Sequence, residues 1–307
     1  MRHEFVQALI AAAQGDDRVV LLTGDLGYMA LEPFAERFPD RFFNIGVAEQ
    51  NMLGLATGLA EAGFVPFAYS IATFASMRPY EFFRNGAILH ELPVRLVGMG
   101  GGLDYGANGV THFALEDLAL MRAQPGLTVV VPAEAMQVEP AVRAALAIEG
   151  PLYLRLERMG APVPGLNGRF ELGRVDVVRA GTDVVFVAAG GVALEASAAA
   201  ERLDARGVSA GLAVVSTLAP APTDELVRVL GGARVAVAVE SHYVNGGLGS
   251  LLAEVIAEHG LGTRLVRCGI DETPRNESGG RDFLHARYGI SAEALEETAA
   301  GALASNG

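Results

Sequence analysis

The sequence predicts an α/β protein of two domains, each a mostly parallel sheet flanked by helices. Its 307 residues are enough for two domains, and hydrophobic residues make up 51% of them, which is enough for buried cores. Short apolar, β-rich runs alternate with helical stretches along the chain. Because these runs are continuously apolar, we expect the strands that they form to be covered on both faces, as in a parallel sheet.

The first domain is predicted at residues 1–157. Strands are expected where apolar residues are continuous, at 19–25, 65–71, 93–100, 127–133 and 151–157. Helices are expected at 49–63, 78–89, 114–124 and 135–148. In the first of these helices, apolar residues recur every three or four positions and Gly63 marks the end.

A Pro- and Gly-rich segment without periodicity, residues 158–173, is predicted to be a linker. It leads to a second α/β domain, predicted at 174–307. Strands are expected there at 183–190, 209–216, 233–240 and 263–269, and helices at 193–206, 222–230, 247–259 and in the tail from 290 to 304.

Charge and cysteine content exclude several classes of function. The net charge is −13, so the surface repels phosphate backbones and we expect no nucleic-acid partner. An anionic substrate would need a local cluster of arginines. Cys268 is the only cysteine, which excludes an intrachain disulfide and favours a reducing compartment. With no long apolar run and no signal-peptide pattern, we expect a soluble cytoplasmic protein without a membrane partner.

The segment FFNIGVAEQNMLGLATGLA, residues 42–60, places Glu49 at the start of an apolar helix. Such a glutamate can simply complement the helix dipole. It can also be a partly buried acid whose pKa is shifted for catalysis. The residues around it decide between the two: GVAEQNM, followed by a helix with spaced Gly and Ala, resembles the glutamate segment of the transketolase family.

This resemblance extends over nearly the whole chain, with a pyrimidine-binding domain first and a transketolase C-terminal domain second. It implies that Glu49 hydrogen-bonds the pyrimidine ring of thiamine diphosphate and drives it toward the imino tautomer, which then removes the thiazolium proton. The cofactor performs the carbanion chemistry and the protein tunes it. Family members place aromatic residues after a Thr to pack on that ring. Phe74 and Tyr80 match two of these positions, and Met77 stands where another aromatic is common.

The segment GMGGGLDYGANGVTHFALED, residues 98–117, resembles the family's GxGxxGxTHxxxED motif. The resemblance implies that His112 points into the active site, where it assists proton transfer and binds the substrate oxygen. Two positions depart from the transketolase pattern. Gly100 replaces a second His, and Asn108 replaces an Asp that binds a sugar hydroxyl. Because Asn108 still forms hydrogen bonds but carries no charge, the substrate is expected to differ from the standard pentose phosphates.

Three further residues are candidates for substrate binding. Arg155 and Arg158 lie near the carboxyl end of a predicted strand, where open α/β sheets bind ligands. Relatives keep an arginine in this segment to bind the substrate phosphate, and Arg158 is the better match. His242 precedes a GGLGS helix start that resembles the family's C-terminal domain, and we expect it to face the mouth of the active site.

The chain is expected to hold no metal itself. Thr23-Gly24-Asp25-Leu26 begins like the Gly-Asp-Gly metal-binding signature of thiamine diphosphate enzymes, but Leu26 breaks it. Asp25 instead resembles an acidic residue near the cofactor. The family's further domain, which binds the diphosphate through Mg²⁺, has no counterpart in this sequence. We therefore expect an N-terminal partner subunit that carries it, and a heterotetramer of two copies of each chain.

The resemblance thus predicts one half of a split transketolase that transfers a two-carbon ketol unit from a ketose, free or phosphorylated, to an aldehyde. Two alternatives remain open. One is a subunit resembling 1-deoxyxylulose-5-phosphate synthase or a 2-oxoacid-decarboxylating enzyme, which the wording VAEQ and YLRLER favours. The other is a non-catalytic scaffold that keeps the fold, against which the intact Glu49 and His112 argue.

Overall fold

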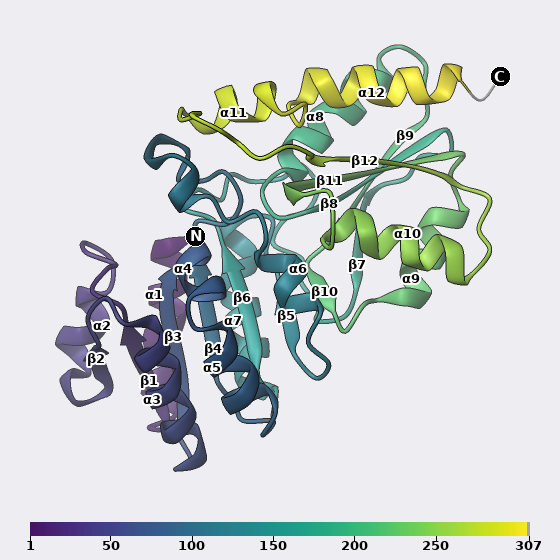
Figure 1. The fold of residues 1–307 in the computed structure, drawn as a ribbon. Helices are drawn as coiled ribbons and strands as arrows, with labels where there is room; N and C mark the ends of the chain where they lie inside the picture. Colours follow the sequence, from purple (N-terminus) through teal and green to yellow (C-terminus); the bar gives the residue numbers. More distant parts are fainter. Residues whose placement is uncertain (306–307) are drawn as a thin grey trace.

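The computed structural model describes residues 1–305 and contains two sheets, each covered by helices on both faces (Figure 1). The predicted α/β class with mostly parallel sheets is confirmed. The first sheet has seven strands in the order β10-β5-β6-β4-β3-β1-β2. They are β1 (Val19–Thr23), β2 (Phe42–Asn44), β3 (Val65–Ile71), β4 (Arg95–Met99), β5 (Thr128–Val130), β6 (Leu152–Leu156) and β10 (Thr217–Ala219).

Two groups of helices cover the first sheet. On one face, α1 (Arg2–Gly15) and α7 (Val138–Ala147) pack together over the strands. On the other face lie α3 (Glu49–Glu61), α4 (Ala72–Met77), α5 (Tyr80–Phe83) and α6 (Asp117–Arg122). The helix expected at 78–89 is α5 followed by a π-helical turn (Arg84–Ile88). At the edge of the sheet, α2 (Glu32–Arg37) and a short 3-10 turn (Pro39–Arg41) lead into β2.

The second sheet has five strands in the order β12-β11-β8-β9-β7. Among the described pairs of this sheet, β7 alone runs antiparallel to its neighbour. The strands are β7 (Val175–Arg179), β8 (Val184–Ala189), β9 (Ala210–Val215), β11 (Val235–Tyr243) and β12 (Arg264–Ile270). Helices α8 (Ala193–Asp204) and α12 (Ala292–Ala304) pack on one face, and α9 (Thr223–Gly231) and α10 (Leu248–Glu258) on the other (Figure 1). Between β12 and α12 lies α11 (Arg281–Arg287).

The two halves share a core, and one strand of the second half joins the sheet of the first. One apolar cluster joins residues of the first half, such as Leu22 on β1, to residues of the second half, such as Val187 on β8 and Leu252 on α10. The strand β10 leaves the second half and pairs antiparallel with β5 of the first sheet. Residues 158–173, all of them described, contain no helix or strand, yet Val163 and Leu166 are buried. The halves are therefore held together tightly rather than tethered.

The apolar runs behave as their continuity predicts. All five residues of β1, β4 and β6 are buried, because helices lie on both faces of the sheet. Among residues 1–305, no helix combines the length and the apolar character that a membrane crossing requires.

Candidate active site

The candidate residues of the first half gather at the carboxyl ends of its parallel strands. Glu49 follows β2, Phe74 lies on α4 directly after β3, and His112 lies in the loop between β4 and α6. Arg158 comes two residues after β6. Parallel α/β sheets bind ligands at this edge, because the loops there converge while the strands hold them rigidly.

Glu49 is the first residue of α3 and is 1% exposed. Its Oε1 accepts a hydrogen bond from Ser70 Oγ at 3.3 Å, and its Oε2 lies 2.9 Å from Arg78 Nη1. Gly24, at the end of β1, lies beside the carboxylate: a Cβ there would be 3.6 Å from Oε1. The carboxylate is thus buried between the ends of β1 and β3, held by one hydroxyl and one cation.

Arg78 and Phe74 together connect Glu49 to His112. The Arg78 guanidinium carbon lies 4.0 Å from the centre of the Phe74 ring, and the ring in turn meets His112 edge-on with the ring centres 5.2 Å apart. The hydroxyl of Thr111 lies 3.0 Å from His112 Nδ1 and helps to fix the imidazole. The structure therefore brings together Glu49, Phe74 and His112, which three separate motifs predicted.

The row formed by Glu49, Phe74 and His112 continues to a corner that contains several arginines. Tyr105 lies with its ring centre 6.2 Å from that of His112, and the Arg158 guanidinium carbon lies 5.0 Å from the Tyr105 ring. Beyond it is a cavity of about 400 Å³ lined by Arg2, Asp104, Arg158 and Arg281, among others. Arginines suit phosphate or sulfonate because their planar groups donate two hydrogen bonds at once.

Asp104 is the acidic residue among the arginines of this cavity and reduces its positive charge when ionised. Its Oδ2 accepts a hydrogen bond from the backbone N–H of Arg158. Burial and, to a smaller extent, the negative charge of the nearby Glu157 raise the pKa of the Asp104 carboxyl to about 6. Glu157 itself is paired with Arg281 at 3.1 Å, which leaves Arg2 and Arg158 as the arginines of this cavity most available to an anion.

Tyr105 also explains one departure from the transketolase pattern. Gly100 has a φ of +79°, which disfavours a side chain, and a Cβ at this position would collide with the Tyr105 ring. Tyr105 therefore occupies the space beside Gly100 that a histidine side chain would need. Asn108, the second departure, is exposed in the same loop, in the 3-10 turn Gly106–Asn108 that precedes the turn Val110–His112.

Asp25, Tyr80 and Met77 lie around the row rather than in it. Asp25 is exposed at the end of β1, where its Oδ1 accepts hydrogen bonds from Tyr28 and Asn44, which lower the pKa of its carboxyl. The Tyr80 hydroxyl donates to the backbone carbonyl of Leu120 on α6, and its ring packs against the core. Met77 is 43% exposed. Of these three, Asp25 is nearest to the strand end that flanks Glu49.

The structure does not bring Arg155 or His242 to this row. Arg155 is buried inside β6, where its Nε donates to Asp117 Oδ2 at 2.9 Å. His242 is buried inside β11, with Nδ1 2.6 Å from the Tyr243 carbonyl and Nε2 accepting from the Ala119 N–H. Burial lowers the pKa of His242 to about 4, so its ring is neutral. Both residues hold the two halves together instead of facing a substrate.

Arg78 and Arg2 also lie at the site, although no sequence motif indicated them. Arg78 lies four residues after Phe74 on the same helical stretch, and this spacing places two side chains on one helix face. That signal could have found it. Arg2 is far in sequence from the loops that line the cavity, and it reaches the cavity only because α1 packs against the first sheet. No local pattern indicates its position.

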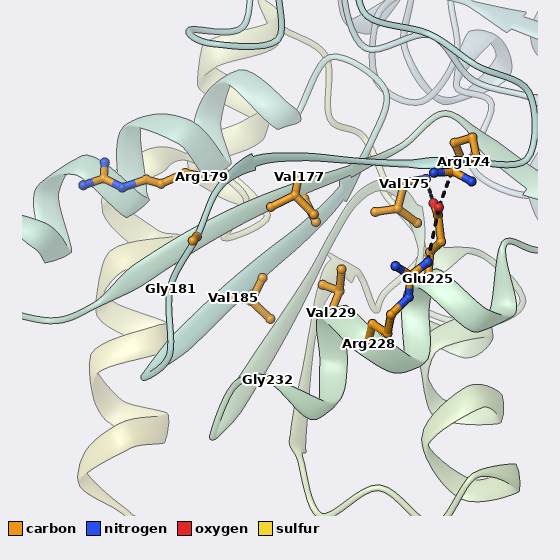
Figure 2. Close-up of a pocket in the computed structure, with 12 residues that line it drawn as sticks. Arg174, Val175, Val177, Arg179, Gly181, Val185, Glu225, Arg228, Val229 and Gly232 are labelled. Carbon is orange, nitrogen blue, oxygen red and sulfur yellow. Dashed lines mark hydrogen bonds and ion pairs between the residues drawn. The ribbon is translucent and has the colours of Figure 1, made fainter.

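A second cavity, of about 440 Å³, lies between β7 and α9, away from the row (Figure 2). Figure 2 shows Arg174 and Arg228 turned toward Glu225, with ion-pair distances of 2.8 and 3.4 Å. The third arginine of this cavity, Arg179, pairs with Asp204. Since its cations are already paired, we place the candidate site at the row.

Comparisons with known proteins cover nearly the whole chain. The transketolase pyrimidine-binding domain family matches residues 1–163, and the transketolase C-terminal domain family matches residues 173–295. The 6-deoxy-6-sulfo-D-fructose transketolase subunit SqwH of Clostridium sp. strain MSTE9 is 35% identical over 97% of this chain and 93% of its own length. The 1-deoxy-D-xylulose-5-phosphate synthase of Syntrophotalea carbinolica is 34% identical over 95% of this chain, but only 46% of its own length is matched.

Among solved structures, a split-gene transketolase described as an inactive β4 tetramer has a TM-score of 0.89 and 36% identity. The match covers 99% of this chain and 98% of that one. The likeness therefore extends to the placement of the two halves, not to one domain alone.

Proposed function

The chain belongs to the transketolase family and corresponds to the C-terminal half of a transketolase. We propose that it is one subunit of an enzyme that transfers a two-carbon ketol unit from a ketose to an aldehyde. One observation carries the proposal: Glu49, Phe74 and His112 form a row at one sheet edge. A buried acid, an aromatic face and an imidazole at one sheet edge are what this chemistry needs from the pyrimidine-binding side.

The family implies dependence on thiamine diphosphate, and the residues present fit its aminopyrimidine ring. A flat, delocalised group with N–H donors, the Arg78 guanidinium, already lies between the Glu49 carboxylate and the Phe74 face. Glu49 would bind a nitrogen of the ring and Phe74 would pack on one face of it. When bound, the cofactor supplies the carbanion chemistry. The outer wall of this proposed ring-binding site would be formed by Asp25, Tyr80 and Met77.

The diphosphate and Mg²⁺ are assigned to a partner. We propose an N-terminal subunit that carries them, in a heterotetramer of two copies of each chain. Two findings support this: the chain matches only about half of a single-chain synthase, and a split-gene relative solved as a tetramer of β chains is described as inactive. The chain would then be active only when the partner completes the site.

For the substrate, we propose a sugar with an anionic end. Arg158 and Arg2 would bind that end, while His112 binds the reacting oxygen and moves a proton at it, and Asn108 contacts a hydroxyl. Relatives at similar identity are named for a sulfonated and a phosphorylated sugar, and both groups are anions that a pair of arginines binds.

Reconstitution with the N-terminal subunit, thiamine diphosphate and Mg²⁺ tests this function. Fructose 6-phosphate, 6-deoxy-6-sulfofructose and fructose would be compared as donors with one aldehyde acceptor, and the tetrose product measured. We expect turnover of an anionic donor and a much higher KM for neutral fructose. Failure of every ketose would contradict the proposal.

A second candidate is favoured by the match to the deoxyxylulose-phosphate synthase. Enzymes of that type release CO₂ from a 2-oxoacid before they form the new bond. Adding pyruvate to the same complex separates the two: CO₂ release without ketose turnover favours a synthase-like or 2-oxoacid-decarboxylating subunit. Loss of both activities in a complex that assembles would favour a scaffold subunit.

A further inference from the structure

The Arg78 side chain contacts both groups that the proposed function assigns to the aminopyrimidine, the Glu49 carboxylate and the face of the Phe74 ring. Its Nη1 lies 2.9 Å from Glu49 Oε2, and its guanidinium carbon lies 4.0 Å from the centre of the Phe74 ring. We infer that Arg78 competes with the aminopyrimidine of thiamine diphosphate for this place and must swing out before the cofactor binds. This inference rests on the proposed function and adds one step to it. We call this step, the movement of Arg78 away from Glu49 and Phe74, the gate.

The guanidinium and the aminopyrimidine exclude each other because they are alike. Both are flat and delocalised, both present N–H groups that a carboxylate accepts, and both pack on an aromatic face. At 4.0 Å from the ring centre, the guanidinium already lies at stacking distance from Phe74. A second flat group cannot lie on the same face at the same time.

The burial of Glu49 explains why this place needs an occupant. The Glu49 side chain is 2% exposed, and its contact with Ser70 Oγ is longer, at 3.3 Å. A buried carboxylate is costly unless it is paired. Arg78 supplies the pairing charge, and the ring would supply a hydrogen bond in its stead.

Arg78 is also placed so that it can leave. It directly follows the last residue of α4, and its side chain is 41% exposed. Its guanidinium can therefore turn into solvent without opening the core. The energy lost with the ion pair is subtracted from the affinity for the cofactor, so the apparent affinity depends on the fraction of molecules in which Arg78 has moved.

The test measures thiamine diphosphate binding by calorimetry at fixed Mg²⁺, on the complex with the N-terminal subunit. Arg78→Ala is expected to bind the cofactor roughly fivefold to tenfold more tightly than the wild type, because the competing group is gone. Before cofactor is added, the same variant is expected to unfold at a lower temperature. Arg78→Lys keeps the charge but loses the flat face, and both effects should be intermediate.

Chemical rescue makes the competition direct. Millimolar guanidinium chloride, far below denaturing concentrations, is expected to fill the place that Arg78→Ala vacates. It should raise the unfolding temperature of that variant and weaken its cofactor binding, with little effect on the wild type. Arg84→Ala removes an exposed arginine from the adjoining helical turn and is the matched control. It should leave both quantities unchanged.

The outcomes separate the gate from the proposed function. If the wild type binds the cofactor but Arg78→Ala binds it equally or more weakly, the gate is wrong and the proposed function stands. If guanidinium chloride affects wild type and Arg78→Ala alike, the gate is also wrong. If no form of the complex binds thiamine diphosphate, the proposed function fails, and the inference fails with it.

Discussion

Arg155 and Asp117 form a buried ion pair, with 2.9 Å between Nε and Oδ2 and side chains that are 1% and 0% exposed. The pair joins the two halves, because Arg155 Nη2 also donates to the carbonyl of Ser241 on β11, at 2.8 Å. Tyr153 donates to the same Asp117 oxygen at 2.7 Å. The Arg155 guanidinium therefore stabilises the contact between the two halves and is not available to a substrate.

We expect Arg155→Met to reduce the free energy of unfolding by about 3–5 kcal/mol, because it leaves the Asp117 charge buried without its cation. Arg158→Met, at an exposed position three residues later, should change stability by about 0.5 kcal/mol or less. Urea unfolding of the two variants checks this contrast. Equal stability of Arg155→Met and the wild type would show that the pair contributes nothing.

Arg158→Met should act on substrate binding instead. If Arg158 donates to the anionic end of the donor, its removal should raise KM for fructose 6-phosphate by about tenfold to a hundredfold, the range for a hydrogen bond to a charged group. The kcat should change little, because the reacting carbon lies at the other end of the sugar. Steady-state kinetics of the reconstituted complex checks this, with neutral fructose as the control donor. A similar rise in KM for fructose would argue against an anion contact.

The different roles of these two arginines show what a sequence can predict. Arg155 lies within the apolar run that forms β6, and a charged residue inside a strand covered on both faces must be buried and paired. Arg158 lies beyond the end of the strand and is free to face a ligand. The position of His242 was less predictable, since β11 runs to Tyr243, three residues beyond the expected strand, and encloses it.

Pairing between distant segments was the least predictable feature of the fold. The runs that form β1, β3, β4 and β6 are mostly apolar, so the burial of these strands follows from local sequence. The three residues of β10 carry no pattern that indicates the first sheet as their partner, and only the shared core places them beside β5. The same holds for Arg2, which reaches the cavity with Arg158 through helix packing.

Asp104 should make stability depend on pH. Burial raises its pKa to about 6, above the value of about 3.9 expected in the unfolded chain. The folded chain therefore holds the proton more tightly, and the free energy of unfolding falls as pH rises from about 4 to about 6. Above that range both states are ionised and the loss is complete, up to about 3 kcal/mol.

Asp104→Asn cannot ionise but can still accept the Arg158 N–H, so it should lack this loss. Urea midpoints of unfolding at pH 4.5 and pH 7.5 check the effect. The midpoint of the variant should rise relative to that of the wild type as pH rises. Asp17→Asn, at a fully exposed carboxyl, serves as the control. Parallel profiles for Asp104→Asn and the wild type would contradict the raised pKa.

Glu49→Gln should separate catalysis from folding. The amide can keep the contact with Ser70 and fits the same space, so we expect the chain to fold and to assemble with its partner. It cannot carry the charge that would activate the bound ring, and kcat for ketose turnover should fall by about 10²–10⁴-fold, the range for loss of an acid–base group. Glu61→Gln, an exposed position near the end of the same helix, should keep full activity. Near wild-type turnover by Glu49→Gln, in a complex shown to contain cofactor, would remove Glu49 from the mechanism and with it the reason for placing the active site at this row.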